Sequence, residues 1–391
     1  MKRILYVELS SGFGGSSAAL YSCLKYLNKT KFYPLVLITH QGINFDRIRA
    51  LGVPVIRVPL LMIKHDVRDN PFVSYSKALI NLIFDIFFNA GRIKAVIRKE
   101  KIDLVHINTN IKNNLQTILA AQWAKVPCVC HVRETRILLK LEKNYRRFLS
   151  RIVVLNKEAL AIISDGYNPQ QVNLIPDGYD PGLEVLEEDI QKIKQEMSLE
   201  GKYSIGTLGR LVEGKGQDDL IRAAAIILKE HKNVKFLVIG NDPDHDHSFE
   251  RKLRALAQEL DLGNNLIFTG WRTDKNEIMS VLDIVVLASS TFPEGTPLSC
   301  IEAMAFKKPV VATNIPGLNY IVDNGLTGIL VPPADPKSLA AAIIKIMHDP
   351  MLAQKMGEAG KKRVEKYFDI KTVVTKIENM YEAVFGEIPH V

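Results

Sequence analysis

The chain has 391 residues, of which 47% are hydrophobic and 24% are charged. This length exceeds one ordinary hydrophobic core and predicts two domains, and the composition excludes long disordered stretches. The first 180 residues carry 26 Lys and Arg against 13 Asp and Glu, whereas the remainder carry 25 against 30. This basic half has no zinc finger, no aromatic RNA-binding motif and no long basic run. We therefore exclude nucleic acid and favour a membrane surface or an acidic acceptor as its partner.

The first apolar run predicts a strand and not a targeting segment. It is short and is interrupted by Glu8, unlike the core of a secretory signal. The longest apolar tract, 78–90, carries Asp85 and is too short to cross a bilayer. The cysteines lie in apolar runs without metal-binding spacing, which indicates reduced core residues: Cys23, Cys128, Cys130 and Cys300. We therefore expect a cytoplasmic protein, either soluble or bound at the inner face of the cytoplasmic membrane.

Short β-branched runs alternate with longer helical patterns, which is typical of α/β proteins with parallel sheets covered by helices on both faces. In the first half the expected strands are Ile4–Leu9, Tyr33–Thr39, Val55–Val58, Ile102–Ile107, Pro127–His131, Ile152–Leu155 and Val172–Ile175. In the second half they are Tyr203–Leu208, Val234–Ile239, Leu266–Thr269, Ile284–Leu287, Val310–Ala312 and Gly328–Val331. The sequence therefore predicts the same architecture twice.

A Pro, Gly and Asp cluster separates the two halves and places a hinge near Gly178–Pro181. After the last expected strand, Asp369–Phe385 has the pattern of an amphipathic helix, which we expect to pack back on the first domain. The predicted domains are residues 1–178, residues 179–368, and a C-terminal segment of residues 369–391.

The segment "SSGFGGSSAAL", Ser10–Leu20, joins the first expected strand to a helix. A dinucleotide-binding fingerprint would read G-x-G-x-x-G and would be followed by an acid after the second strand. Here Ser17 stands at the third glycine position and no acid follows the second strand, so we exclude NAD. Gly14 and Gly15 still allow a ligand to approach the start of the helix closely.

Two histidines, His106 and His131, end two expected strands of the first half. Histidines at strand ends usually form hydrogen bonds in loops or cores, but two at neighbouring sheet ends favour a function. Arg133 and Arg136 follow closely and are candidate partners of an anionic acceptor, although a solvated surface position explains them more simply.

The segment "GRLVEGK" matches GxxxxGK after an expected strand, as in a phosphate-binding P-loop, but Gly216 follows where a magnesium-binding Ser or Thr is required. Its glycine N–H groups can still cradle phosphate, with Arg210 and Lys215 supplying charge. A solvated basic turn is the alternative.

The segment "FPEGTPLSCIEAMA" predicts a helix start beside Glu294, with Thr296 as the N-cap and Pro297 in the first turn. We expect the backbone N–H groups of Gly295–Leu298 to form an anion site and Glu302 to point from the helix toward a ligand. Two carboxylates beside an anion site suit a ligand that is part sugar and part phosphate. Isolated surface acids are the alternative interpretation.

These motifs resemble the retaining glycosyltransferases of family 4. The resemblance rests on Arg210 with Lys215, on Glu294 and Glu302 with seven residues between them, and on "GLTGILVPPADP" at Gly325–Pro336. It covers nearly the whole chain and implies the GT-B fold, in which two Rossmann-like domains face each other across a cleft.

The resemblance also implies roles for single residues. Arg210 and Lys215 would bind the diphosphate of a UDP- or GDP-sugar, and Glu302 would accept hydrogen bonds from the ribose. Glu294 would lie against the transferred sugar, with His131, ranked above His106, supporting the reaction centre. The backbone of Gly14, Gly15, Gly295, Thr296, Pro297 and Leu298 would approach sugar and phosphate, and Trp271 or Arg272 would contact the base.

The interdomain segment "VNLIPDGYD" resembles the family's segment, in which Asn is common where this chain has Asp177. The departure is conservative. For the reaction, the resemblance implies a same-face substitution in which the leaving phosphate accepts the acceptor's proton, with no cofactor and no metal ion. The acceptor would be a glycan or a lipid-linked molecule. The cluster "NDPDHDHSFE", which includes Asp242 and Asp244, then reads as a solvated loop.

The segment Ser76–Lys99 is apolar on one side and cationic at its end, which suits either a core helix or a contact with the membrane surface, and we favour the core helix. Two other functions stay open. One is a nucleotide-sugar epimerase, which would need proton-abstracting acids in the first domain. The other is a non-catalytic protein that binds nucleotide-sugars.

Overall fold

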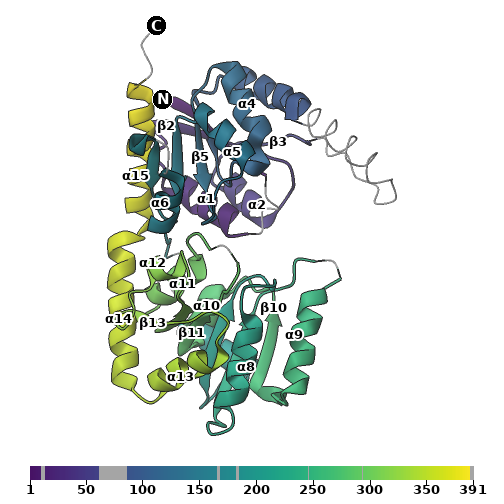
Figure 1. Cartoon of the computed structure of the whole chain (residues 1–391), viewed down its shortest axis with the longest axis vertical. Helices are drawn as coiled ribbons and strands as arrows, with labels where there is room; N and C mark the ends of the chain where they lie inside the picture. Colours follow the sequence, from purple (N-terminus) through teal and green to yellow (C-terminus); the bar gives the residue numbers. More distant parts are fainter. Residues whose placement is uncertain are drawn as a thin grey trace. The chain divides into compact units, whose positions relative to one another are not determined.

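A computed structural model describes the chain except for residues 10–13, 61–85, 165–167, 182–184, 245, 293 and 388–391. The chain divides into two compact units (Figure 1). The first unit comprises Met1–Gly178 together with Ile370–Val391, and the second comprises Tyr179–Asp369.

The first unit is built on a seven-stranded parallel sheet with the order β3-β2-β1-β4-β5-β6-β7. Its strands are β1 Lys2–Glu8, β2 Phe32–Ile38, β3 Val55–Arg57, β4 Leu104–Ile107, β5 Cys128–Val132, β6 Arg151–Val154 and β7 Val172–Leu174. Its helices are α1 Gly15–Tyr26, α2 Ile43–Ala50, α4 Leu115–Ala124, α5 Lys140–Tyr145, α6 Lys157–Ser164 and α15 Ile370–Gly386. Residues 86–99 are also helical, and residues 76–85 of the helix expected there lie outside the described residues.

Alternating side chains of the strands divide the apolar core of the first unit between the two sheet faces. Ile4 and Tyr6 of β1 pack with α1, α2 and α15, whereas Leu5 and Val7 pack with helix 86–99, α4 and α6. Each face of the sheet is therefore covered by helices, as Figure 1 shows.

The second unit has a six-stranded parallel sheet with the order β10-β9-β8-β11-β12-β13. The strands are β8 Tyr203–Leu208, β9 Val234–Ile239, β10 Leu266–Gly270, β11 Ile284–Leu287, β12 Val310–Thr313 and β13 Gly328–Val331. The helices are α7 Glu187–Glu196, α8 Gln217–Ile227, α9 Ser248–Glu259, α10 Lys275–Val281, α11 Leu298–Ala305, α12 Leu318–Ile321, α13 Pro336–Met347 and α14 Pro350–Tyr367. Helices α8, α9 and α13 pack on one face, α7, α10, α11 and α12 pack on the other, and α14 contributes side chains to both cores.

The two parallel sheets with helices on both faces confirm the predicted α/β class, and every expected strand corresponds to an observed one. In both sheets the strand order reverses at one point, between β1 and β4 in the first and between β8 and β11 in the second. Open α/β sheets bind ligands beside such a point, at the carboxyl ends of the strands. The loops that follow these four strands are therefore the expected positions of a ligand-binding site.

The C-terminal helix α15 belongs to the first unit, although the chain reaches it from the second. Its apolar face recurs at helical spacing and is buried against β1, α1 and α2: Ile370, Val373, Val374, Ile377, Met380, Tyr381 and Val384. The segment before the hinge fits closely on this helix, because a Cβ on Gly178 would meet the Cα of Ile370 at 2.8 Å.

The four cysteines are free and buried, as their apolar surroundings predicted. Burial raises the pKa of each thiol, that of Cys23 to about 12. Within the part of the chain that the structure describes, every helix is too short or too polar to cross a membrane.

Candidate functional site

Three aromatic rings stack across neighbouring strands of the first sheet. Tyr6 of β1 lies 5.1 Å from His106 of β4 between ring centroids, and His106 lies 4.9 Å from His131 of β5. The strand register pairs Tyr6 with His106, and His106 with Val129, so all three rings lie on the sheet face covered by α1 and α15. The two histidines predicted at neighbouring strand ends are thus in contact.

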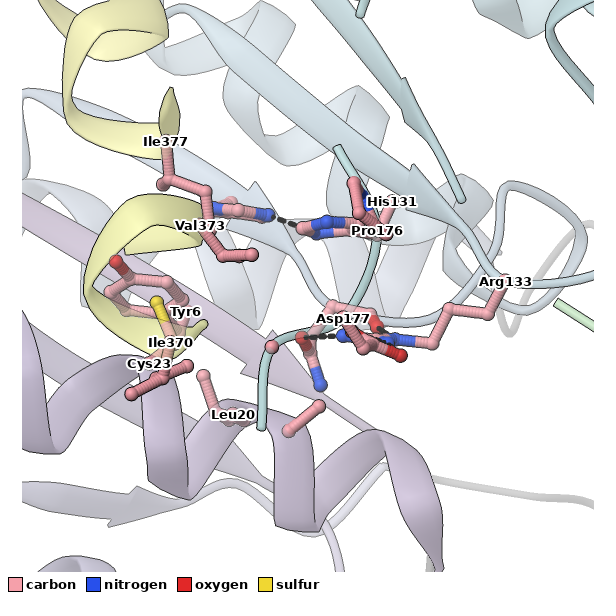
Figure 2. Close-up of a pocket in the computed structure, with 14 residues that line it drawn as sticks. Tyr6, Leu20, Cys23, His131, Arg133, Pro176, Asp177, Ile370, Val373 and Ile377 are labelled. Carbon is pink, nitrogen blue, oxygen red and sulfur yellow. Dashed lines mark hydrogen bonds and ion pairs between the residues drawn. The ribbon is translucent and has the colours of Figure 1, made fainter. Parts of the chain in front are cut away.

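The two histidines are hydrogen-bonded to each other, whereas the sequence analysis treated them as alternative candidates for the reaction centre. His106 Nε2 lies 2.7 Å from His131 Nδ1, and His106 Nδ1 bonds to the hydroxyl of Tyr381 on α15. His131 lines a small pocket together with Arg133 and Asp177, which Figure 2 shows.

Both imidazoles are neutral at physiological pH. Burial, reinforced by the positive charge of Arg133, lowers the pKa of His106 to about 3. The same two causes, followed by the neighbouring His106, hold the pKa of His131 well below its usual value. A neutral imidazole has one N–H donor and one bare nitrogen, so these residues can orient polar groups without carrying charge.

The sequence favoured solvated surface positions for Arg133 and Arg136. In the structure both side chains instead form ion pairs with buried carboxylates. The Arg133 side chain is only 13% exposed, because its guanidinium lies 2.6 Å from both carboxylate oxygens of Asp177 and also donates to Asn108. Arg136 pairs at 2.8 Å with Glu142, whose side chain is 1% exposed. In both cases an ion pair with a buried carboxylate holds the guanidinium away from solvent.

The pairing with Arg133 gives the Asp177 carboxylate a charged partner within the first unit. Asn108 extends this network, since its amide donates to the buried carboxylate of Glu8 and, at 2.9 Å, to the carbonyl of Ser16. Polar groups from β1, α1, β4, β5 and the hinge segment therefore meet at the carboxyl ends of the strands. We call His106, Asn108, His131, Arg133 and Asp177 the first-unit cluster.

Gly14 and Gly15 begin helix α1, next to the point where the strand order reverses. Gly14 has φ −89°, which any residue adopts. Among the described residues, a Cβ on either glycine would meet nothing within 4 Å. Packing against the described residues therefore does not explain the two glycines, and their predicted closeness to a ligand stays a prediction.

In the second unit, the loops after β8 and β11 bring opposite charges together. Lys215 Nζ lies 2.6 Å from Glu294 Oε1, and Ser289 Oγ donates to the same oxygen at 2.7 Å. The ring of Phe292 lies under both cations, 4.2 Å from Lys215 Nζ and 5.8 Å from the Arg210 guanidinium carbon. We call Arg210, Lys215, Ser289, Phe292 and Glu294 the second-unit cluster, and it lies where the order of the second sheet reverses.

The glycines of the "GRLVEGKG" loop hold this cluster together. Gly216 has φ +74°, and a Cβ there would lie 2.0 Å from the carbonyl oxygen of Ala288. The carbonyl of Gly214 accepts a hydrogen bond of 2.8 Å from the N–H of Ser290. These glycines let the loops after β8 and β11 approach closely, and the phosphate cradle that the sequence predicts in this loop stays a prediction.

The expected cap of helix α11 is wrong by one residue. The helix begins at Leu298 with Pro297 at the N-cap position, and the Pro297 carbonyl accepts hydrogen bonds from Cys300 and Ile301 at its start. Thr296 precedes the cap, and Pro297 has no N–H to offer, so the predicted anion site of Gly295–Leu298 has one donor fewer than we expected.

The other predicted donor-site residues are Glu302, Arg272 and Trp271, of which the first two form ion pairs. Glu302 on α11 forms an ion pair with Lys275, so its carboxylate has a cation beside it. Arg272 lies 2.6 Å from Asp274 and is also paired with Glu196, whereas Trp271 is 48% exposed. Trp271 is therefore the more accessible of the two residues expected to contact a base.

The acidic cluster after β9 is exposed or partly exposed at most of its described residues, as predicted for a solvated loop, and Asp242 is the exception. Asp242 is buried and accepts the backbone N–H groups of Asp244, Phe249 and Glu250, which stabilises the start of α9. Burial raises the pKa of Asp242, but these hydrogen bonds together lower it further, and the net pKa lies below the usual value.

Sequence reasoning missed several residues that complete the two clusters. Tyr381 contacts His106, and Ser289 donates to Glu294, yet neither belongs to a predicted motif. The spacing of the C-terminal helix could have placed Tyr381 on its apolar face. Ser289 had a weaker signal, its position two residues after β11.

Two family models match the chain in succession. The model described as "Glycosyltransferase Family 4" matches residues 13–183, and the model described as "Glycosyl transferases group 1" matches residues 189–363. Together they span most of both units.

Curated relatives of the chain are also glycosyltransferases. The chain is 27% identical over 357 residues to the "UDP-Gal:alpha-D-GlcNAc-diphosphoundecaprenol alpha-1,3-galactosyltransferase" of Escherichia coli, a match that covers 86% of this chain and 84% of the relative. It is 32% identical over 202 residues to the "Capsular polysaccharide biosynthesis glycosyltransferase CapM" of Staphylococcus aureus, which covers 52% of this chain and only 50% of that relative.

Among solved structures, Anabaena Alr3699/HepE in complex with UDP and glucose superposes with a TM-score of 0.82 at 22% identity, covering 98% of this chain and 100% of that one. At this identity the likeness shows the fold, which is the GT-B fold of two Rossmann-like domains that the sequence predicted. The motifs, the two family models and the fold agree, and the chain belongs to the family 4, group 1 glycosyltransferases.

Proposed function

We propose that the protein is a retaining hexosyltransferase that moves a sugar from a nucleoside diphosphate to a glycan or a lipid-linked acceptor. The second-unit cluster carries this proposal. It places two cations and a hydrogen-bonded carboxylate at the carboxyl ends of β8 and β11, where open α/β sheets bind nucleotides.

We assign the diphosphate to Arg210 and Lys215. Lys215 is a compact charge with three donors, so it can keep its bond to Glu294 and still face a phosphate oxygen. Arg210 is exposed and adds a forked pair of donors. As the bond between sugar and phosphate breaks, negative charge grows on the departing oxygen, and both cations stabilise it.

We assign the sugar and nucleoside to the neighbouring side chains. Glu294 accepts hydrogen bonds from the transferred sugar, Glu302 from the ribose, and the exposed ring of Trp271 stacks on the base. We propose a UDP- or GDP-sugar as donor, and complexes of HepE with UDP and with UDP-glucose support UDP as the first to test.

We propose that the acceptor hydroxyl attacks the anomeric carbon from the face that the phosphate leaves. The bond from that carbon to the phosphate oxygen breaks, a bond to the acceptor oxygen forms, and the acceptor's proton passes to the departing phosphate. The anomeric configuration is retained. His131, which is neutral, and Glu294 act as orienting groups in this step and not as nucleophiles.

The acceptor proposal rests on relatives. The Escherichia coli relative is described as acting on a diphosphoundecaprenol-linked sugar, and CapM as acting in capsular polysaccharide synthesis. We propose that this protein works in the cytoplasm at the inner face of the membrane, where the basic first half contacts anionic lipid. Co-sedimentation with vesicles of phosphatidylglycerol, compared with phosphatidylcholine, tests this contact, and equal binding to both would contradict it.

A panel of UDP- and GDP-sugars tests the donor. Thermal stabilisation selects the binding sugar, since a ligand at about a hundred times its dissociation constant adds about 2.7 kcal/mol. Incubation with that donor and with glycan or polyprenyl diphosphate-linked acceptors then measures nucleoside diphosphate release and the anomeric configuration of the product. Interconversion of donor sugars without transfer would instead indicate an epimerase, and binding without turnover a non-catalytic protein.

We also propose that transfer needs no metal ion. The oxygens of Asp242, the acid that most resembled a metal handle, are already used by backbone N–H groups. Turnover should therefore be the same after dialysis against EDTA, and recovery of lost activity by added Mg²⁺ or Mn²⁺ would overturn this part of the proposal.

A further inference from the structure

A continuous line of hydrogen bonds joins the pocket to the C-terminal helix. His131 Nδ1 lies 2.7 Å from His106 Nε2, His106 Nδ1 bonds to the Tyr381 hydroxyl, and that hydroxyl lies 3.0 Å from the hydroxyl of Tyr6. All four side chains are buried, so no bulk water competes for these bonds.

Every group in this line is neutral. Burial and Arg133 lower the pKa values of both histidines, whereas burial raises the pKa values of the two tyrosines. Each imidazole therefore has one N–H, and each hydroxyl has one O–H. The direction of one bond in the line consequently fixes the direction of all the others.

Either tyrosine hydroxyl can donate to the other across the 3.0 Å that separates them, so the line has two possible directions. If Tyr381 donates its hydrogen to Tyr6, the Tyr381 oxygen accepts from His106 Nδ1–H. His106 Nε2 is then bare and accepts from His131 Nδ1–H. His131 is left with a bare Nε2, which is a hydrogen-bond acceptor.

We propose that Tyr381 donates to Tyr6 and is a positioning residue that fixes the tautomer of His131 through His106, so that His131 offers an acceptor to a hydroxyl group of the sugar. The choice of a sugar hydroxyl rests on the proposed function, whereas the tautomer does not. A residue of the C-terminal helix thereby sets the chemistry of a residue in β5, and the polar line explains why a hydroxyl lies on an otherwise apolar helix face.

The alternative is that Tyr381 only packs. Its ring is fully buried and lies edge-on to Phe32 at 5.5 Å between centroids, so the loss of the residue would disturb the core. Removing the hydroxyl alone separates the two roles. The variant Tyr381→Phe keeps the ring, and Val384→Ala loosens the same buried face of α15 without touching the line.

Nitrogen-15 NMR of the full-length protein labelled at histidine reads the tautomers directly, because a bare ring nitrogen resonates far downfield of a protonated one. Single His106→Gln and His131→Gln variants assign the signals. We expect both histidines to be protonated at Nδ1 in the unsubstituted protein. In Tyr381→Phe, His106 loses the acceptor for its Nδ1–H, and both histidines should shift toward the Nε2–H form.

Val384→Ala should lower stability and leave both tautomers unchanged. Tyr6→Phe is the second variant, because it removes the acceptor for the Tyr381 O–H and frees that hydrogen to turn toward His106. It should shift the tautomers while Tyr381 is still present. The assignment would be overturned if both tyrosine variants kept the original tautomers, or if Val384→Ala showed the same shift. It would also be overturned if His131 of the unsubstituted protein were protonated at Nε2.

Turnover tests the ligand part separately. With a donor and acceptor identified, Tyr381→Phe should lower kcat by about ten-fold, as is usual for residues that orient a functional group, with a smaller change in KM. Val384→Ala should keep its kcat. A tautomer shift without a loss of kcat would leave the role of Tyr381 intact and would remove His131 from the reaction centre.

Discussion

Lys215 Nζ lies 2.6 Å from Glu294 Oε1, and the pair joins the loops after β8 and β11. Glu294 is buried, with a side chain 6% exposed, whereas Lys215 is 20% exposed. The lysine therefore has a structural partner on one side and access to solvent on the other. This arrangement lets one residue hold the loop and meet a phosphate.

Lys215→Ala should reduce both stability and turnover. It removes the ion pair between Lys215 and the buried Glu294 carboxylate, which costs about 2 kcal/mol of unfolding free energy. It also removes a charge from the diphosphate site, so kcat/KM should fall about a hundred-fold. Urea unfolding and initial rates measure the two effects.

The matched control for this substitution is Lys252→Ala, which breaks an exposed pair with Glu213 whose side chains are 67% and 74% exposed. Its unfolding free energy should change by less than about 0.5 kcal/mol, with turnover unchanged. Equal rates for Lys215→Ala and the unsubstituted protein would remove Lys215 from the site.

Gly15→Ala should affect ligand binding and not folding. No described atom lies within 4 Å of the added Cβ, so the unfolding free energy should stay within about 0.5 kcal/mol. If a ligand approaches this backbone, the KM for it should rise at least about ten-fold. An unchanged KM would show that no substrate approaches Gly15.

Gly216→Ala should behave in the opposite way. Its Cβ would lie 2.0 Å from the Ala288 carbonyl oxygen at a φ of +74°, so folding should be weakened by more than about 2 kcal/mol. Thermal unfolding of Gly15→Ala and Gly216→Ala, measured under the same conditions, compares the stability of the two variants. A stable Gly216→Ala would contradict the close approach of the two loops.

Asp177→Asn tests the ion pair with Arg133. The amide keeps one acceptor oxygen but loses the charge that balances a guanidinium only 13% exposed, so the unfolding free energy should fall by about 1 to 3 kcal/mol. Asp189→Asn, which alters an exposed pair with Lys192, should have almost no effect. A loss of stability equal in the two variants, measured by urea unfolding, would show that the Asp177 charge is not needed.

Stability should fall as the pH drops below about 6.5. The pKa of His106 is lowered to about 3 in the folded protein, against about 6.5 when unfolded, so between these values the unfolded chain binds a proton that the folded protein does not. Unfolding is then favoured by about 1.4 kcal/mol per pH unit, or about 2 kcal/mol at pH 5 for this residue.

Urea titrations of His106→Gln at several pH values measure this slope, which should be shallower than in the unsubstituted protein. The exposed His40→Gln should keep the original slope. A slope for His106→Gln identical to that of the unsubstituted chain would mean that His106 is not buried in its neutral form.

The architecture could be predicted because it depends on local patterns. The strands of both sheets are short apolar runs between helical segments, and the loops after β8 and β11 follow directly from that alternation. The charged residues of the second-unit cluster could be named because Arg210, Lys215 and Glu294 stand in motifs of fixed spacing.

The partners of those residues could not be predicted, because they depend on which segments fold beside each other. Nothing near Arg133 in the sequence indicates that Asp177, which is 44 positions away, would pair with it. Likewise Tyr381 lies 275 positions from His106, and only the packing of α15 on the first sheet joins them. Similarly, nothing near Gly216 in the sequence indicates that it would lie against the carbonyl group of Ala288.

The position of α15 also bears on the order in which the protein folds during synthesis. The second unit is continuous from Tyr179 to Asp369, so all of its strands are synthesised before α15. The first unit is begun earlier, yet the apolar surface around Ile4 and Tyr6 lacks part of its cover until Ile370–Gly386 emerges. Domains usually complete folding from the N-terminus onward. In this chain the unit that starts first is completed last, and a nascent chain interrupted before α15 would expose that surface to chaperones and proteases.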